Sequence, residues 1–170
     1  MKKTIVTSIV LLIFINVFPQ ELNQVIVDPN IEEEILYGYC NREGLVSGQF
    51  NGWFEPEYLS YVVNDSIIFG MNLELLLSCN ITVVMGTWCS DSQREIPRLY
   101  KILDYVHFPE NDLKLICIDR KKNADGTFVQ DLNIELVPTI IFYHEDEELG
   151  RIIESPQESL EADMGRILGQ

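Results

Sequence analysis

The chain has 170 residues, of which 46% are hydrophobic and 23% charged, so it suits one compact domain once any targeting segment is removed. Its formal net charge of −15 disfavours phosphate backbones and anionic lipid, so nucleic-acid binding is not expected. The cysteines are too sparse and too irregularly spaced for a disulfide scaffold or a zinc site, and we expect no metal and no cofactor.

Residues 1–20 predict a secretory signal peptide. Lys2 and Lys3 precede an apolar run from Ile5 to Phe18, which gives the charged and hydrophobic parts of such a segment. The run is shorter than the roughly 20 apolar residues that span a bilayer. We therefore expect an exported protein, periplasmic or otherwise extracytoplasmic, that contacts the membrane only if the segment is retained as an anchor. The alternative is a buried helix.

Residues 21–66 are expected to form an N-terminal extension that packs on the following domain. The segment is rich in aromatic, acidic and turn residues, but it has no sustained helical or strand period. Aromatic side chains would attach it to the domain, and they are Tyr37, Tyr39, Trp53, Phe54, Tyr58 and Tyr61.

Residues 67–170 are expected to form one α/β domain. Apolar residues at helical spacing predict a helix over Ile67 to Leu77, and the β-branched run from Ile81 to Gly86 predicts a buried strand. A second helix is expected to start close to Cys89, because apolar residues follow it at helical spacing. Leu113 to Ile118 then predicts a second buried strand.

The C-terminal part predicts a hairpin and a closing helix. A short helix is expected over Phe128 to Leu132, followed by an antiparallel hairpin from Thr139 to Tyr143 and from Leu149 to Glu154. The closing helix is expected to use Ser155 as its N-cap, with Glu158 completing a capping box.

Three short motifs resemble the thioredoxin family. They are Trp88-Cys89-Ser90-Asp91-Ser92, Pro97, and Val137-Pro138-Thr139, and the resemblance covers about residues 67–169. Glu95-Ile96-Pro97 is similar to the exported thioredoxins of cytochrome maturation and to Bacteroidetes-type thioredoxin-like proteins. The resemblance implies a thioredoxin fold with a central mixed β-sheet flanked by helices, here preceded by an N-terminal extension.

Within this resemblance Cys89 is the candidate catalytic nucleophile, because a helix N-terminus favours the thiolate. Asp91 would oppose this effect with a carboxylate beside the sulfur. The bond between Val137 and Pro138 resembles the cis peptide of the family, and together with Trp88 it would bind an extended substrate chain. The alternative for Cys89 is a small buried apolar residue.

The sequence departs from the family at Ser92, where thioredoxins have their second cysteine. A serine can only hydrogen-bond the Cys89 sulfur and cannot resolve a mixed disulfide. Cys117 and Cys40 are possible resolving thiols, although a buried structural role is the alternative for Cys117. A disulfide from Cys40 to either Cys89 or Cys79 also stays open.

Two functions of different classes follow. The first is an exported thioredoxin-like thiol–disulfide oxidoreductase that acts through the single nucleophile Cys89, by mixed-disulfide or isomerase-type exchange. Its partners would be protein or small-molecule thiols and disulfides. The second is a redox-inactive thioredoxin-fold module that binds extended polypeptides around Trp88 and Pro138. Binding that survives a Cys89→Ser substitution would favour the second.

Overall fold

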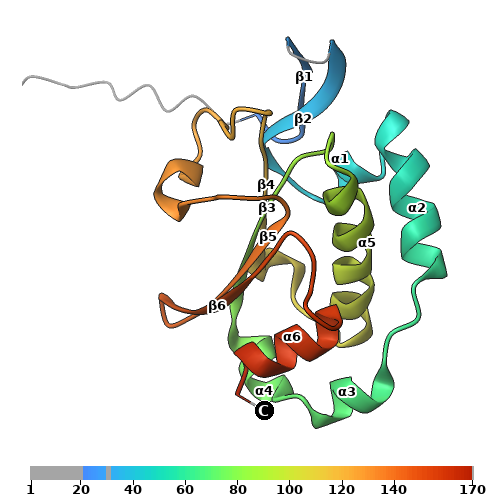
Figure 1. Ribbon diagram of the computed structural model, residues 1–170, viewed down its shortest axis with the longest axis vertical. Helices are drawn as coiled ribbons and strands as arrows, with labels where there is room; N and C mark the ends of the chain where they lie inside the picture. Colours follow the sequence, from blue (N-terminus) through green and yellow to red (C-terminus); the bar gives the residue numbers. More distant parts are fainter. Residues whose placement is uncertain (1–20, 30–31, 170) are drawn as a thin grey trace, which may run out of the picture.

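The computed structural model describes residues 21–29 and 32–169 (Figure 1), so the expected signal segment lies outside the described residues. The strands are β1 (Gln24–Asp28), β2 (Glu33–Cys40), β3 (Asn80–Met85), β4 (Leu113–Cys117), β5 (Thr139–His144) and β6 (Glu147–Ile153). The helices are α1 (Arg42–Leu45), α2 (Asn51–Ser60), α3 (Asp65–Gly70), α4 (Leu73–Ser78), α5 (Ser90–Tyr105) and α6 (Leu160–Ile167). Short 3₁₀ turns are η1 (Gly48–Phe50), η2 (Glu110–Asp112) and η3 (Val129–Leu132). Within these ranges no helix combines the length and the apolar character that a membrane crossing requires.

The described strands form one mixed sheet in the order β1-β2-β4-β3-β5-β6. The helix α5 connects the parallel strands β3 and β4, while β5 lies antiparallel to both β3 and β6. A β3-α5-β4 unit followed by β5-β6-α6 on the same sheet is the thioredoxin fold. The expected α/β architecture, a central mixed sheet with flanking helices, is confirmed.

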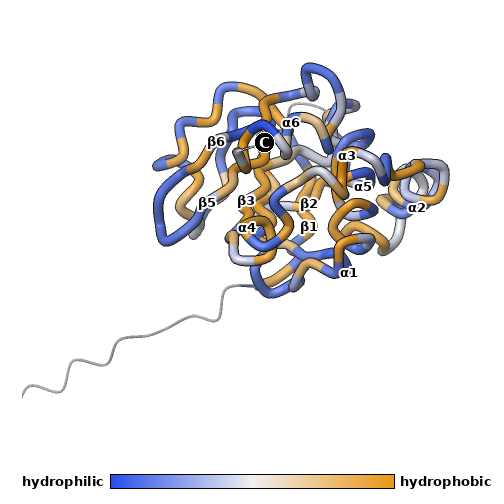
Figure 2. Tube along the Cα trace, turned by 90° about the horizontal axis from the view of Figure 1, so that it is seen from below, coloured by the Kyte–Doolittle hydropathy of each residue, from blue (hydrophilic) through white to orange (hydrophobic). Residues whose placement is uncertain are grey.

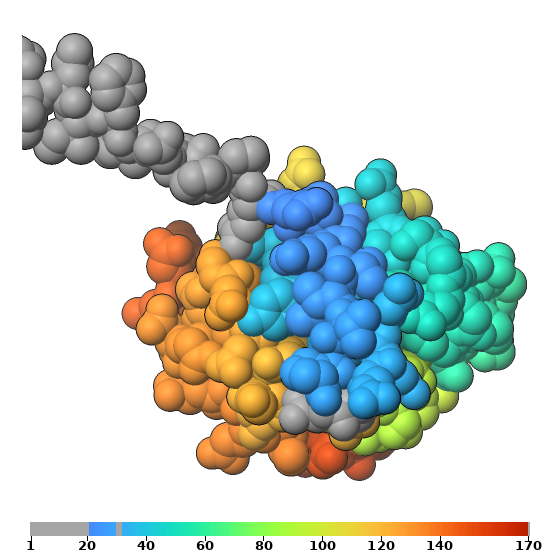
Figure 3. All heavy atoms as spheres, turned by 90° about the horizontal axis from the view of Figure 1, so that it is seen from above, coloured from blue at the N-terminus to red at the C-terminus, as the bar shows by residue number. Residues whose placement is uncertain are grey.

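The segment before α3 contributes to this sheet. Strand β2 pairs antiparallel with β4, and β1 pairs with β2 at the edge. The sequence pattern did not predict β2 as a strand, because Ile35 and Leu36 are both buried and Gly38 has a φ of +81°. A bent strand breaks the simple alternation that sequence patterns detect. Figure 3 shows this hairpin as a blue band between α2 and the residues that follow β4.

The two faces of the sheet are covered differently. The larger hydrophobic cluster joins one face to α5, α6 and the helices before β3, with Leu99, Phe142 and Met164 among its buried members. The smaller cluster lies on the opposite face, where Val84 and Ile116 pack against the segment between β4 and β5. The strands β3 and β5 run through the apolar centre in Figure 2.

Two helix expectations need correction. The helix expected over residues 67–77 is two short helices, because Asn72 ends the first run and caps α4 by accepting a hydrogen bond from the Leu75 N–H at 3.1 Å. The closing helix begins at Leu160, with Ser159 as its N-cap, rather than after Ser155. The Ser159 hydroxyl accepts the Ala162 N–H at 3.1 Å, which is the bond that defines a cap.

Candidate active site

The candidate site lies at the carboxyl end of β3, where the chain turns into α5. Cys89 is the N-cap of this helix, with φ −97° and ψ 123°, and its carbonyl oxygen accepts the Gln93 N–H at 2.9 Å. The turn itself closes through a 3.0 Å bond from the Cys89 N–H to the Gly86 carbonyl. This places the thiol at the positive end of a 16-residue helix, where negative charge on sulfur is favoured.

The thiol faces the loop that leads into β5. The Cys89 sulfur donates a hydrogen bond of 3.2 Å to the carbonyl oxygen of Val137, and the bond between Val137 and Pro138 is cis. Cys89 is partly exposed, whereas Cys40, Cys79 and Cys117 are buried. The candidate nucleophile and the backbone that was expected to bind substrate, 48 residues apart in the sequence, thus contact each other.

Ser92 lies fully buried one turn into α5. Its hydroxyl oxygen accepts the backbone N–H of Gly86 at 3.3 Å. The residue at the position of the missing second cysteine therefore ties the helix to the turn that carries Cys89.

Two contacts fix the indole ring of Trp88, the residue that precedes Cys89. Its indole N–H donates to the carbonyl of Ile118 at 2.9 Å, and the guanidinium of Arg120 lies 4.8 Å from the ring centroid. Gly86 allows the ring to lie close, because a Cβ at that position would come within 2.5 Å of the indole. The backbone after β4 therefore positions the side chain next to Cys89.

The first turn of α5 carries a network of charges. Asp91 was expected to oppose the helix dipole, but its carboxylate pairs with Arg94 at 2.8 Å. Arg94 also binds Glu95 at 2.6 Å and the hydroxyl of Ser155 at 2.9 Å, and the hydrogen bond to Glu95 raises the pKa of Arg94. The expected effect of Asp91 is therefore partly compensated by a neighbouring cation.

Sequence reasoning missed the polar groups that hold the turn. The hydroxyl oxygen of Thr87 accepts the Leu36 N–H of β2 at 3.2 Å, and the carbonyl of Thr87 accepts the Gln93 amide at 2.7 Å. Arg120 could have been found, because it follows a strand that is parallel to β3 and must end at the same edge of the sheet. Nothing in the sequence indicated the contact with Leu36.

The expected resolving thiols do not contact Cys89. Cys117 and Cys40 belong to the hydrophobic cluster on the α5 face of the sheet, whereas Cys89 contacts the cluster on the opposite face. Cys79 precedes β3 at the strand end far from the turn. Cys117 and Cys40 thus lie on the other side of the sheet from Cys89, and a resolving role for either stays a prediction.

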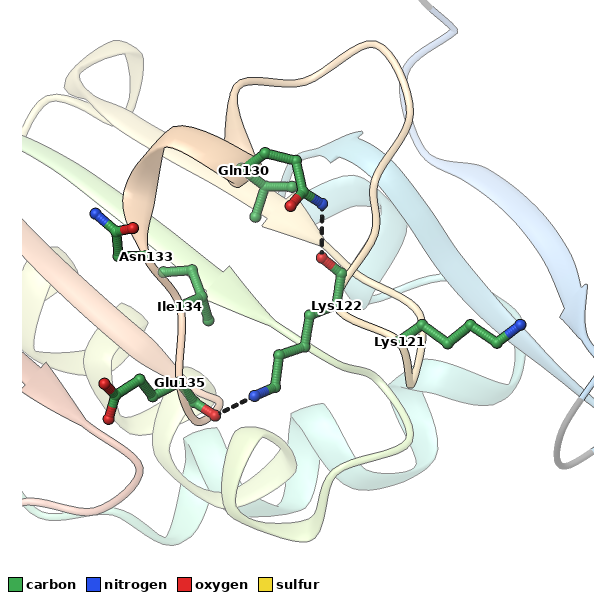
Figure 4. A pocket seen from close by; sticks show the side chains of 7 residues that line it. Lys121, Lys122, Gln130, Asn133, Ile134 and Glu135 are labelled. Atoms are coloured by element: carbon green, nitrogen blue, oxygen red, sulfur yellow. Dashed lines mark hydrogen bonds between the residues drawn. The ribbon is translucent and has the colours of Figure 1, made fainter.

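A surface pocket of about 440 Å³ lies between the turn after β4 and the segment that leads from η3 toward β5 (Figure 4). Val129 and Ile134 line it and also form part of the hydrophobic cluster that Cys89 and Trp88 contact. A hydrogen bond from the Lys122 ammonium group to the carbonyl of Glu135 closes one side. The complete lining is Lys121, Lys122, Val129, Gln130, Asn133, Ile134 and Glu135.

No family model matches the sequence, and no curated protein matches it. Among solved structures, the chain is similar to a protein of unknown function from Pseudomonas aeruginosa, with 20% identity and a TM-score of 0.44 over 69% of this chain and 81% of that one. Thioredoxin O2 from Arabidopsis thaliana gives 19% identity and a TM-score of 0.40, over 64% of this chain and 95% of that one. Trxlp from Edwardsiella tarda gives 16% identity and a TM-score of 0.39, over 64% and 96%. At these TM-scores the matches carry no weight of their own, and the fold assignment rests on strand order and connection.

Proposed function

We propose that this chain is a thioredoxin-like thiol–disulfide oxidoreductase that uses Cys89 as its single nucleophile. One observation carries the proposal: a partly exposed thiol at a helix N-terminus lies 3.2 Å from the carbonyl that precedes a cis proline. This arrangement supports both an activated sulfur and a backbone edge for an extended substrate.

The reaction begins when the Cys89 thiolate attacks one sulfur of a substrate disulfide. A bond forms between Cys89 and that sulfur, and the second substrate sulfur leaves as a thiolate. Because Ser92 has no thiol, release requires a thiolate from the substrate or from a small thiol, which attacks the mixed disulfide and frees Cys89. The Cys89 cycle transfers no net electrons, so its products are rearranged or exchanged disulfides.

The backbone around Pro138 supports substrate binding. The carbonyl of Val137 accepts the thiol proton in the resting site, and it loses this partner when Cys89 ionises. A substrate N–H can then bind the freed carbonyl while Trp88 covers the reacting sulfur. Extended polypeptides with an accessible disulfide are the substrate class that suits this geometry.

We also propose that the protein is exported to an extracytoplasmic compartment. The support is in the sequence, where the apolar run from Ile5 to Phe18 follows two lysines, and in the likeness of Glu95-Ile96-Pro97 to exported thioredoxins. Expression of the full chain in a bacterial host, followed by cell fractionation, tests this proposal. Retention of the whole product in the cytosolic fraction would contradict it.

A mixed-disulfide assay tests the proposed chemistry. The reduced full chain is incubated with oxidised glutathione or a scrambled disulfide protein, trapped with acid and analysed by mass spectrometry. We expect an adduct on Cys89, its loss in Cys89→Ala, and its retention in the matched control Cys79→Ala, because Cys79 is buried. An unmodified Cys89, together with peptide binding that survives Cys89→Ala, would instead indicate a binding module.

A further inference from the structure

Two thiols lie together in the sheet, away from the candidate site. Strands β2 and β4 pair so that Gly38 stands directly opposite Cys117, and Cys40 stands opposite Leu115. Cys40 and Cys117 both point into the hydrophobic cluster on the α5 face. The Cys40 sulfur lies 3.7 Å from the carbonyl oxygen of Gly38, the residue that faces Cys117.

Gly38 bends β2 close to this pair. Its φ is +81°, which residues with a side chain rarely adopt, and a Cβ built there would meet no atom within 4 Å. Cys40 and Cys117 are diagonal neighbours in the register, and their thiols hydrogen-bond each other.

Both thiols are removed from solvent. Cys117 has no exposed surface and Cys40 is 6% exposed. Burial raises the pKa of Cys117 well above its usual value, and a hydrogen bond with the Cys40 thiol acts in the same direction. Protonated, buried thiols react slowly. A reaction of this pair therefore belongs to folding or to an opened state, when an oxidant can reach it.

We propose that Cys40 and Cys117 form a disulfide that joins β2 to β4 when the chain folds in the presence of a small-molecule or protein disulfide. One thiolate attacks the oxidant disulfide and releases a thiolate, and the other cysteine then displaces the second half of the oxidant. The two cysteines lose two electrons and two protons, and the oxidant becomes two thiols. The side chains close the bond by rotating toward each other across the β2–β4 pair. This inference does not depend on the proposed function of Cys89.

The other cysteines are not placed to compete. Cys117 of β4 stands opposite Met85 of β3, at the end of β3 that is far from Cys79. The six residues of β3 separate those ends by about 20 Å. Cys89 contacts the cluster on the opposite face of the sheet. The expected product is thus one specific bond rather than a mixture.

Peptide mapping tests the pairing. The full chain is refolded in a buffer of reduced and oxidised glutathione, denatured, labelled with N-ethylmaleimide and digested without reduction. We expect a peptide pair that joins Cys40 to Cys117, with the label on Cys79 and either the label or glutathione on Cys89. The same link must persist in Cys89→Ala, which separates this proposal from the Cys89 chemistry. Label on both Cys40 and Cys117, or a link from either to another cysteine, would overturn it.

Thermal unfolding gives a second test. A link that closes a loop of about 77 residues should raise the unfolding temperature by roughly 10 °C. Reductant should lower the midpoint of the native chain and of the Cys79→Ala control by that amount. It should leave the Cys40→Ala/Cys117→Ala variant unchanged. An equal effect of reductant on the double variant would refute the proposal, and the peptide map decides the question if that variant does not fold.

Discussion

The thiol of Cys89 donates its proton to the carbonyl oxygen of Val137, across 3.2 Å. A thiolate has no proton to donate, so this bond exists only while Cys89 carries its proton. Ionisation therefore produces the nucleophile and frees a substrate-binding carbonyl in the same step. Under the proposed function, chemical activation and substrate binding are coupled through one hydrogen bond.

Ser92→Cys should convert the site to a dithiol. The new thiol would lie one helical turn after Cys89, in a position that is now fully buried against Gly86. An intramolecular thiol acts at a far higher effective concentration than one in solution, so insulin reduction should rise by at least about tenfold. Adducts on Cys89 should become scarce in the same trapping assay. Unchanged adduct yields would show that residue 92 cannot reach the sulfur.

Gly86→Ala should disturb Trp88 more than it disturbs the rest of the fold. Its Cβ would lie within 2.5 Å of the indole, so the ring must move. We expect a loss of about 1–3 kcal/mol in the free energy of unfolding, measured with urea, and slower exchange at Cys89. Gly52→Ala is the matched control, since a Cβ at that position of α2 meets no atom within 4 Å. Equal effects of the two substitutions would contradict the close approach.

Loss of the charge of Asp91 and loss of the charge of Arg94 should change the alkylation rate of the Cys89 thiol in opposite directions. Arg94→Gln leaves the carboxylate near Cys89 uncompensated, so alkylation by neutral iodoacetamide at pH 7 should slow roughly threefold. Asp91→Asn should speed it by a similar factor. A neutral reagent is essential because a charged one would report attraction as well as reactivity. Rate changes of the same sign in both variants would argue against an electrostatic effect.

Trp88 should report on the chemistry of Cys89 by fluorescence. The chain has two tryptophans, and Trp53 lies in α2. Formation of a mixed disulfide on the neighbouring Cys89 should change the emission of Trp88. The change should persist in Trp53→Phe and vanish in Trp88→Phe. A fluorescence change that vanishes in Trp53→Phe but persists in Trp88→Phe would place the conformational response outside the site.

Asp104 should make stability depend on pH in the acid range. Its carboxylate accepts two bonds from Arg42, at 2.6 and 2.7 Å, and one from the Tyr58 hydroxyl at 2.6 Å. Burial acts to raise the pKa of Asp104, but the bonds from Arg42 and Tyr58 outweigh it, and the pKa is lowered. A depressed carboxyl pKa stabilises the fold above the unfolded value, about 3.9, and this contribution is lost as pH falls through the folded pKa.

The variant Asp104→Asn should therefore lose about 1 kcal/mol at pH 7, a figure reduced for solvent screening. The difference from the native chain should shrink toward zero near pH 2–3, where the native carboxylate is also protonated. Urea unfolding at both pH values measures this. Asp131→Asn, on an exposed 3₁₀ turn, is the control. A constant difference at both pH values would mean that charge is not involved.

The sequence predicted the central elements of the domain well, because the patterns that indicate them involve residues close together in the chain. The run before Gly86 is buried on both faces, and α5 repeats its apolar residues at helical spacing, so periodicity identified both elements. Within the candidate site, the helical spacing predicted a helix start close to Cys89, which is the N-cap in the structure. These features depend on neighbours within one turn or one strand.

Long-range pairing is what the sequence could not predict. Strand β2 owes its place to β4, whose partner residues lie more than 70 positions later. The support of the turn by Leu36 and the pairing of Asp91 with Arg94 depend on side-chain directions that periodicity does not contain. The helix start at Leu160 was misplaced because two serines, Ser155 and Ser159, both suit a cap and only the tertiary structure chooses between them.

The hydrogen bond from Leu36 to Thr87 has a consequence for the order of folding. It joins residues 51 positions apart, and β2 also needs β4 before it has a partner in the central sheet. Loop closure over such separations is slow compared with forming a local helix. The first strands to leave the ribosome are thus among the last to be fixed, and the turn that carries Cys89 reaches its final rigidity only when they dock.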